Sequence, residues 1–136
     1  MKQLSSGFLL EQLIDDITAC KDVAQARQLL SELINFTPNL ERAIECCVIS
    51  HAGQFRKSGE PYAIHPILVA CIVAHMGGDE DMIIAALLHD VVEDTDRSIE
   101  SVREDFGEEV AKLVEGLTKI VAIREDKLAS SESNER

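Results

Sequence analysis

Positive charge, aromatic side chains and long apolar runs are all scarce in this sequence of 136 residues. Thirteen Lys and Arg residues stand against twenty-five Asp and Glu residues, which gives a formal net charge of −12. Such a charge repels phosphate polymers and anionic membranes, so we expect neither nucleic acid nor membrane as a partner. No apolar run reaches the roughly 18 residues that span a bilayer, and no secretory signal opens the chain. We therefore expect a cytoplasmic protein.

The four cysteines lack the CxxC spacing that is typical of zinc or redox sites: they are Cys20, Cys46, Cys47 and Cys71. Adjacent Cys46 and Cys47 point to different sides of a helix, and Cys71 lies in an apolar run. The pattern favours buried, reduced thiols over a disulfide scaffold or a zinc knuckle.

Apolar residues make up 46% of the chain, and they repeat at helical spacing almost throughout. Helices are expected over residues 9–17, 26–34, 38–51, 65–75, 82–93, 98–107 and 110–117. Thr37, Asp79 and Ser98 are suited to cap three of them. Strand patterns of useful length are absent. The sequence therefore predicts an all-α bundle with two buried central helices, one domain over residues 1–123 and a polar flexible tail over 124–136.

The strongest functional signal is a His-Asp pair inside an otherwise apolar helix, at His89 and Asp90. Burying an ionised carboxylate costs several kcal/mol unless it is compensated. At helical spacing Glu93 shares a face with His89, and Asp94 shares one with Asp90. A divalent cation would compensate this charge, because imidazole and carboxylate groups are its usual ligands. A hydrogen-bonded pair without metal is the structural alternative.

Two further features support the cation site. His65 opens the preceding apolar helix, and a hairpin turn at Gly77-Gly78 would return the chain so that His65 lies near His89. The glycine-flanked loop before His65 carries Arg56, Lys57 and Ser58, which would supply positive charge in a very acidic protein. Arg can also lay its guanidinium plane on a base, although loops of this kind often serve only solubility.

Four motifs now make the sequence recognisable: HAGQFRKSGEPYAIHP at residues 51–66, AALLHDVVEDT at 85–95, FG at 106–107 and VEGLTK at 114–119. In this order and spacing they resemble the N-terminal hydrolase domain of the RelA/SpoT-homologue family. The resemblance covers roughly residues 40–120. Because several motifs agree at once, it is far more specific than the His-Asp pair alone.

The resemblance implies an HD-domain-like helical fold that holds one Mn²⁺ and acts as a guanosine-3′,5′-bis(diphosphate) 3′-pyrophosphohydrolase. Such an enzyme removes pyrophosphate from the alarmones ppGpp and pppGpp in the stringent response, leaving GDP or GTP. The implied metal ligands are His65, His89 and Asp90. Glu93 and Asp94 match the acidic pair that orients and helps to deprotonate the attacking water.

The same resemblance assigns the loop to the nucleotide. Arg56 matches the residue that packs on guanine, and Lys57 and Ser58 match neighbours that seat the nucleotide. Family members also carry a metal-ligating Asp in a downstream LADRLHN motif, which this sequence lacks. We therefore expect a fragment of a longer chain with a synthetase domain, with a weakened metal site and with exposed apolar surface that favours self-association.

Two alternatives to the hydrolase stay open: an alarmone-binding regulatory module with impaired catalysis, and an HD phosphohydrolase for another nucleotide. Glu93 and Asp94 favour the hydrolase, because a pure binding module needs no water-activating pair. The loop with Arg56 favours the alarmone over other nucleotides. His51 lies on an apolar face and is expected to pack in the core, whereas Tyr62 suits either a nucleotide contact or packing.

Overall fold

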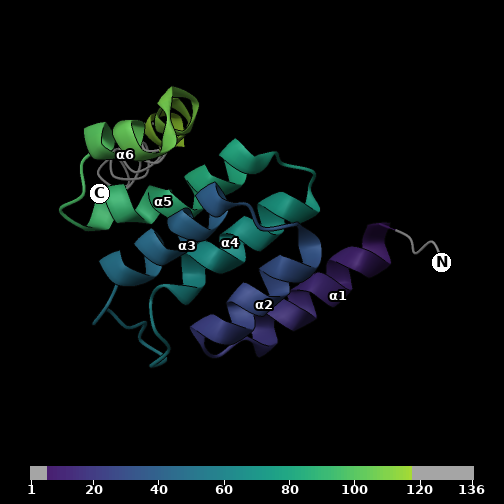
Figure 1. Ribbon diagram of the computed structural model, residues 1–136. Helices are drawn as coiled ribbons and strands as arrows, with labels where there is room; N and C mark the ends of the chain where they lie inside the picture. The colour runs from purple at the N-terminus through teal and green to yellow at the C-terminus, as the bar shows by residue number, and fades with distance from the viewer. Residues whose placement is uncertain (1–5, 118–136) are drawn as a thin grey trace, which may run out of the picture.

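The computed structural model describes residues 6–117 of the chain. Six helices follow one another: α1 (Ser6–Ala19), α2 (Val23–Leu33), α3 (Pro38–Ser50), α4 (Ile64–His75), α5 (Glu80–Asp94) and α6 (Ile99–Phe106). Residues 108–117 are helical as well. The β pairing within this part of the chain is a single isolated bridge between Phe55 and Pro61. The all-α prediction is therefore confirmed (Figure 1). The tail predicted over 124–136 lies outside the described residues.

The helices begin where the capping residues predict. Thr37, Asp79 and Ser98 each accept a hydrogen bond from the backbone N–H three residues later, at 3.2, 2.9 and 3.2 Å. These bonds satisfy donors that the first helical turn leaves without a partner. Asp22 caps α2 in the same way, and this cap was not predicted. At the other end of α6, Gly107 stops the helix with a φ of 104°, a conformation that favours glycine.

The two central helices are α4 and α5, which pack against each other in the middle of the bundle (Figure 1). Helix α2 packs on α4, and α3 packs on α5. In α5 every residue from 83 to 88 is buried, so this helix has no solvent-facing side over nearly two turns. The prediction of two buried central helices is therefore confirmed. Within residues 6–117 no helix has both the length and the hydropathy to cross a membrane.

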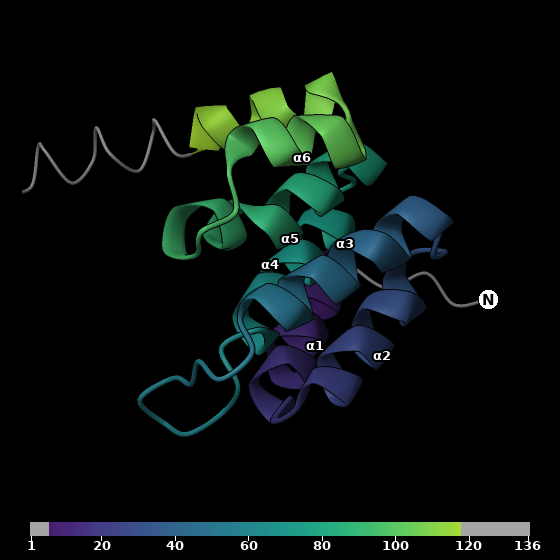
Figure 2. The same cartoon turned by 60° about the vertical axis from the view of Figure 1, so that its left-hand side comes forward.

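The remaining elements flank this centre on opposite sides. Figure 2 shows α1 and α2 at one end of the bundle, and α6 with residues 108–117 at the other. Helix α6 is anchored by buried Val102 and by Arg42 of α3, which donates a hydrogen bond to the carbonyl oxygen of Asp105 at 2.8 Å. The loop between α3 and α4 extends away from the helices (Figure 2). Side chains from α4, α5 and residues 108–117 line one common pocket.

The cysteines divide as the helical pattern predicts. Cys47 and Cys71 are buried, whereas Cys20 and Cys46 are half-buried, and all four are free of disulfides. Burial in apolar surroundings raises the pKa of both Cys47 and Cys71 to about 12. These two thiols are therefore protonated packing groups of the core.

Candidate active site

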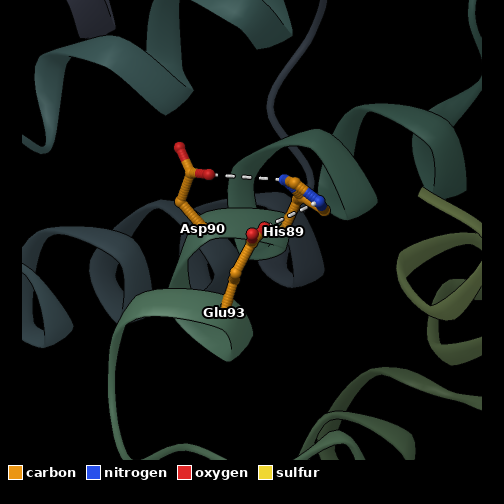
Figure 3. A group of neighbouring side chains, drawn as sticks. All are labelled: His89, Asp90 and Glu93. Atoms are coloured by element: carbon orange, nitrogen blue, oxygen red, sulfur yellow. Dashed lines mark ion pairs between the residues drawn. The ribbon is translucent and has the colours of Figure 1, made fainter. Parts of the chain in front are cut away.

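The last turn of α5 brings an imidazole between two carboxylates. His89 Nδ1 lies 3.3 Å from Asp90 Oδ1, and His89 Nε2 lies 3.3 Å from Glu93 Oε2 (Figure 3). The second contact follows from helix geometry, because residues four apart share a face. The side chains of His89 and Asp90 are each only 17% exposed, whereas that of Glu93 is 35% exposed. The cluster is thus half-buried and open to solvent on the Glu93 side.

A fourth member comes from the start of α4. His65 Nε2 lies 3.7 Å from Asp90 Oδ2, so the two carboxylate oxygens of Asp90 face two different histidines. The antiparallel packing of α4 against α5 produces this approach, as the hairpin predicted. We call these four residues, His65, His89, Asp90 and Glu93, the α5 cluster. It joins four of the eight predicted site residues.

The charges within the α5 cluster act on one another. The hydrogen bond between His89 and Asp90 raises the pKa of the imidazole and lowers the pKa of the carboxyl group. Across residues 6–117, no Lys or Arg side chain forms an ion pair with Asp90 or Glu93. The two carboxylates therefore have only histidines as cationic partners, which leaves a net negative cluster that a metal cation would neutralise.

The donor atoms of the α5 cluster fit a divalent cation. One ligand atom each from His89, Asp90 and Glu93 lies within 4.8 Å of the others. His89 Nε2 is buried and has no hydrogen-bond partner in the described part of the chain. A buried polar atom without such a bond is costly, and coordination to a cation would satisfy it. Imidazole nitrogen and carboxylate oxygen suit Mn²⁺, Fe²⁺, Co²⁺ and Zn²⁺ alike.

A pocket of about 380 Å³ opens beside the cluster. His65, His89 and Asp90 form its polar edge. The rest of its wall is apolar and comes from α4, α5 and residues 108–117: Val69, Val73, Met82, Ala85, Ala86, Leu113 and Leu117. This wall was not predicted. The small Ala85-Ala86 pair one turn before His89 and the four-residue spacing of Leu113 and Leu117 were the signals that could have revealed it.

Asp94 does not join the contacts of the α5 cluster. It is the last residue of α5, and its side chain is exposed. Its negative charge still contributes to the raised pKa of His89 and of Tyr62. Asp94 therefore acts on the cluster through its field and lies free to face an incoming molecule.

The predicted nucleotide loop is exposed and lies on another side of the cluster. Arg56, Lys57 and Ser58 are all exposed and do not line the pocket beside His89. The Ser58 hydroxyl donates to the Glu60 carboxylate, which itself lies 3.9 Å from the Lys21 ammonium. The positive charge of Arg56 partly offsets the burial and the acidic neighbours that raise the pKa of Tyr62, so the loop reaches the cluster electrostatically.

Tyr62 connects the loop to the cluster. Its hydroxyl donates a hydrogen bond to Asp90 Oδ2 at 3.3 Å. Burial, together with the charge of Asp90, raises the pKa of Tyr62 to about 12, so the phenol stays protonated at neutral pH. From the sequence, Tyr62 suits either core packing or a nucleotide contact. The structure shows a different contact, with the carboxylate of Asp90.

Comparisons with known proteins agree with this geometry. A family profile described as HD domain matches residues 43–136. The chain is 52% identical over 97 residues to the guanosine-3′,5′-bis(diphosphate) 3′-pyrophosphohydrolase of Aquifex aeolicus, covering 71% of the chain and 14% of that protein. It is 63% identical over 70 residues to a probable enzyme of the same name from Synechocystis sp., covering 52% of the chain and 9% of that protein.

A third relative is the bifunctional (p)ppGpp synthase/hydrolase SpoT of Escherichia coli, 48% identical over 86 residues, which are 62% of the chain and 12% of that protein. The matched part thus spans only 9% to 14% of the length of these curated relatives. The family profile, in contrast, matches well over half of the chain and includes the whole α5 cluster. The chain belongs to the HD domain family.

Proposed function

We propose that this chain forms the catalytic region of a metal-dependent guanosine-3′,5′-bis(diphosphate) 3′-pyrophosphohydrolase. It would hydrolyse ppGpp to GDP and pppGpp to GTP, releasing pyrophosphate in each case. The observation that carries the proposal is the α5 cluster, a half-buried set of imidazoles and carboxylates without a Lys or Arg partner among residues 6–117, at the edge of a pocket. The names of the relatives from Aquifex aeolicus and Escherichia coli support the substrate.

His65, His89 and Asp90 would hold the cation in this proposal. Both imidazoles approach the same carboxylate, His65 from α4 at 3.7 Å and His89 from α5 at 3.3 Å. We propose Mn²⁺ as the metal, on the strength of the family resemblance rather than of the donor types. A divalent cation there would lower the pKa of water and stabilise the negative charge that develops on the phosphate oxygens.

Glu93 and Asp94 would act on the attacking water. Glu93 is the more exposed of the two carboxylates in the cluster, so its side chain is open to solvent while one oxygen contacts His89. It would accept a proton from the water as the water attacks the 3′ phosphorus. The bond from that phosphorus to the ribose 3′ oxygen then breaks, pyrophosphate is released with the oxygen of the water, and the ribose 3′ oxygen takes up a proton to become the 3′ hydroxyl of GDP. Asp94, exposed one residue further on, would orient the water.

Arg56, Lys57 and Ser58 would bind the nucleotide. The chain carries a net charge of −12, so an anionic substrate needs a local group of cations. Arg56 and Lys57 supply two charges in an exposed loop, and the planar guanidinium of Arg56 can stack on guanine. The loop ends at Tyr62, whose contact with Asp90 links nucleotide binding to the cluster.

The wider context follows from the same proposal. The hydrolase domain would occupy residues 1–123 and work in the cytoplasm beside a synthetase domain, as the bifunctional name of the Escherichia coli relative suggests. Leu113 and Leu117 at the pocket rim are 37% and 41% exposed, and Met82 is 45% exposed. Apolar side chains gathered in this way favour contact with another domain or a second copy of the chain.

The test is to incubate the chain with ppGpp and Mn²⁺ and to follow GDP and pyrophosphate. We expect both products in equal amounts from the wild-type chain, and neither from His89→Ala. His75→Ala is the matched control, because His75 ends α4 outside the cluster and outside the pocket. Thermal melting of both variants verifies that each is folded.

Other outcomes would point to the alternatives. Saturable ppGpp binding without product would overturn hydrolysis by this chain and favour an alarmone-binding regulatory module. Hydrolysis of other nucleotides but not of ppGpp would favour a different HD phosphohydrolase. Equal activity in His89→Ala and the wild-type chain would remove the α5 cluster from the reaction.

A further inference from the structure

Tyr62 lies between the α5 cluster and a buried histidine that the proposed reaction does not use. Its hydroxyl donates to Asp90 Oδ2 at 3.3 Å, and its ring lies between the rings of His51 and His65, at centroid distances of 5.0 and 5.9 Å. The single phenol thus touches a carboxylate and two imidazoles. Such a position suits a residue that orients its neighbours.

The loop holds Tyr62 firmly on its other side. The backbone N–H of Tyr62 donates to the carbonyl oxygen of Gln54 at 2.8 Å, and its carbonyl accepts from the N–H of His65 at 3.0 Å. His51, against the ring, is only 2% exposed, and its Nδ1 pairs with Gln54 Oε1 at 2.9 Å. His51 therefore contacts the ring of Tyr62, and Gln54, which pairs with His51, holds its backbone.

The orientation of Asp90 depends on this contact. One carboxylate oxygen faces His89, and Figure 3 shows the other pointing away from it. That second oxygen meets the Tyr62 hydroxyl at 3.3 Å and His65 Nε2 at 3.7 Å. Without the phenol, only the contacts with His89 and His65 would resist rotation of the carboxylate about its terminal bond, a rotation with broad and shallow minima.

We propose that Tyr62 is a positioning residue that holds the Asp90 carboxylate in the orientation for cation binding, with His51 and Gln54 fixing its ring. The inference rests on the proposed function, because it assumes a cation at Asp90. It assigns a role to the HAGQ segment that begins at His51, which contacts neither the pocket nor the cluster directly. Hydrogen bonds from outer residues to metal-binding carboxylates commonly tune metal affinity in this way.

The test uses Tyr62→Phe, which keeps the ring between His51 and His65 and removes only the hydroxyl. We expect Mn²⁺ affinity, measured by calorimetric titration, to fall about tenfold, the lower end of what outer-residue changes cost. The melting temperature of the metal-free protein stays close to that of the wild-type chain, because ring packing is retained. Ser31→Ala, which removes an exposed hydroxyl on α2, is the control and leaves the affinity unchanged.

A spectroscopic arm reports the contact without metal. Tyr62 is the only Tyr and the chain has no Trp, so all tyrosine emission comes from this residue. A phenol bound to a carboxylate emits weakly, so Asp90→Asn should raise the emission of the metal-free chain. Emission that does not respond to Asp90→Asn, or wild-type affinity in Tyr62→Phe, would overturn the positioning role while leaving the cation site in place. Absence of Mn²⁺ binding in the wild-type chain would instead overturn the proposed function, and this inference with it.

Discussion

Two groups of charged side chains in this molecule are built from similar parts and differ in what neutralises them. On the surface, the guanidinium of Arg103 meets three carboxylates, with Nε 2.6 Å from Glu108, Nη2 2.8 Å from Glu115 and Nη1 3.8 Å from Glu100. In the α5 cluster, the only cationic partners of Asp90 and Glu93 among the described residues are imidazoles, at 3.3 Å for His89 and 3.7 Å for His65. The first group contains its own permanent cation, and the second does not.

This difference indicates a structural role for the Arg103 group and a chemical role for the α5 cluster. Arg stays protonated at every relevant pH, so all three carboxylates of the Arg103 group share a permanent cation, and their remaining charge is 38% to 72% exposed to water. Imidazole can lose its proton, unlike guanidinium, so the α5 cluster has no permanent cation, and its carboxylates are less exposed, at 17% for Asp90 and 35% for Glu93. Excess charge that is out of bulk solvent calls for a bound ion. We therefore read the Arg103 group as a surface ion-pair network and the α5 cluster as a site.

Glu93→Gln should have the largest effect, and it tests whether the α5 cluster, unlike the Arg103 group, takes part in the reaction. If Glu93 takes the proton from water, the rate of ppGpp hydrolysis should fall by about 10²- to 10⁴-fold, the usual contribution of a general base, while Mn²⁺ affinity changes little. Steady-state hydrolysis and a metal titration measure the two effects. Glu115→Gln, the same change in the Arg103 group, should alter neither. Loss of Mn²⁺ affinity in parallel with the rate would make Glu93 a ligand instead of the base.

Leu87→Ala tests whether the middle of α5 serves folding while its end serves chemistry. Leu87 is fully buried two residues before His89. Its truncation leaves a core cavity and should lower the free energy of unfolding by about 2–5 kcal/mol in urea denaturation. Leu10→Ala, at a leucine that is 44% exposed on α1, is the matched control and should cost much less. Equal losses in the two variants would mean that α5 is not the centre of the core.

Arg56→Ala tests whether an exposed arginine, which belongs to neither charged group, contributes to substrate binding. Loss of stacking on guanine should cost about 1 kcal/mol, which raises KM for ppGpp roughly fivefold and changes kcat less. Arg56→Lys keeps the charge and should recover only part of this loss, because ammonium does not stack as a plane. Arg103→Ala should leave KM unchanged. An unaltered KM in Arg56→Ala would remove the loop from the nucleotide site.

The smallest expected effect is a difference in alkylation rate between the adjacent thiols of Cys46 and Cys47. This difference reports burial alone. Because the pKa of Cys47 is raised to about 12, its thiolate fraction stays negligible at pH 8.5, and its buried sulfur is less accessible to a reagent than that of half-buried Cys46. Alkylation of the native chain followed by peptide mass mapping should modify Cys46 well before Cys47. Equal rates would show that the α3 face against α4 and α5 opens readily.

The sequence alone predicts the helices and places four of its candidate site residues near one another, for identifiable physical reasons. Capping chemistry is local, so Thr37, Asp79 and Ser98 mark their helix starts directly. The approach of His65 to Asp90 was predictable as well, because two apolar helices joined by a Gly-Gly turn pack antiparallel.

The remaining features depend on contacts that no local pattern encodes. Neither the apolar pocket wall from residues 108–117 nor the phenol of Tyr62 on Asp90 follows from periodicity, since both join segments distant in sequence. Asp94 shows that a local pattern can also suggest a contact that does not form. Helical spacing puts Asp94 on the face of Asp90, but at the end of the helix its side chain is exposed. Site roles for these residues stay predictions until they are measured.

Calorimetric titration of the chain with Mn²⁺ at neutral pH tests the central claim, that the α5 cluster is a cation site and the Arg103 group is not. The account predicts saturable binding of one ion per chain, lost in His89→Gln and unchanged in Arg103→Ala. Absence of saturable binding to the wild-type chain, or equal binding by His89→Gln, would contradict it.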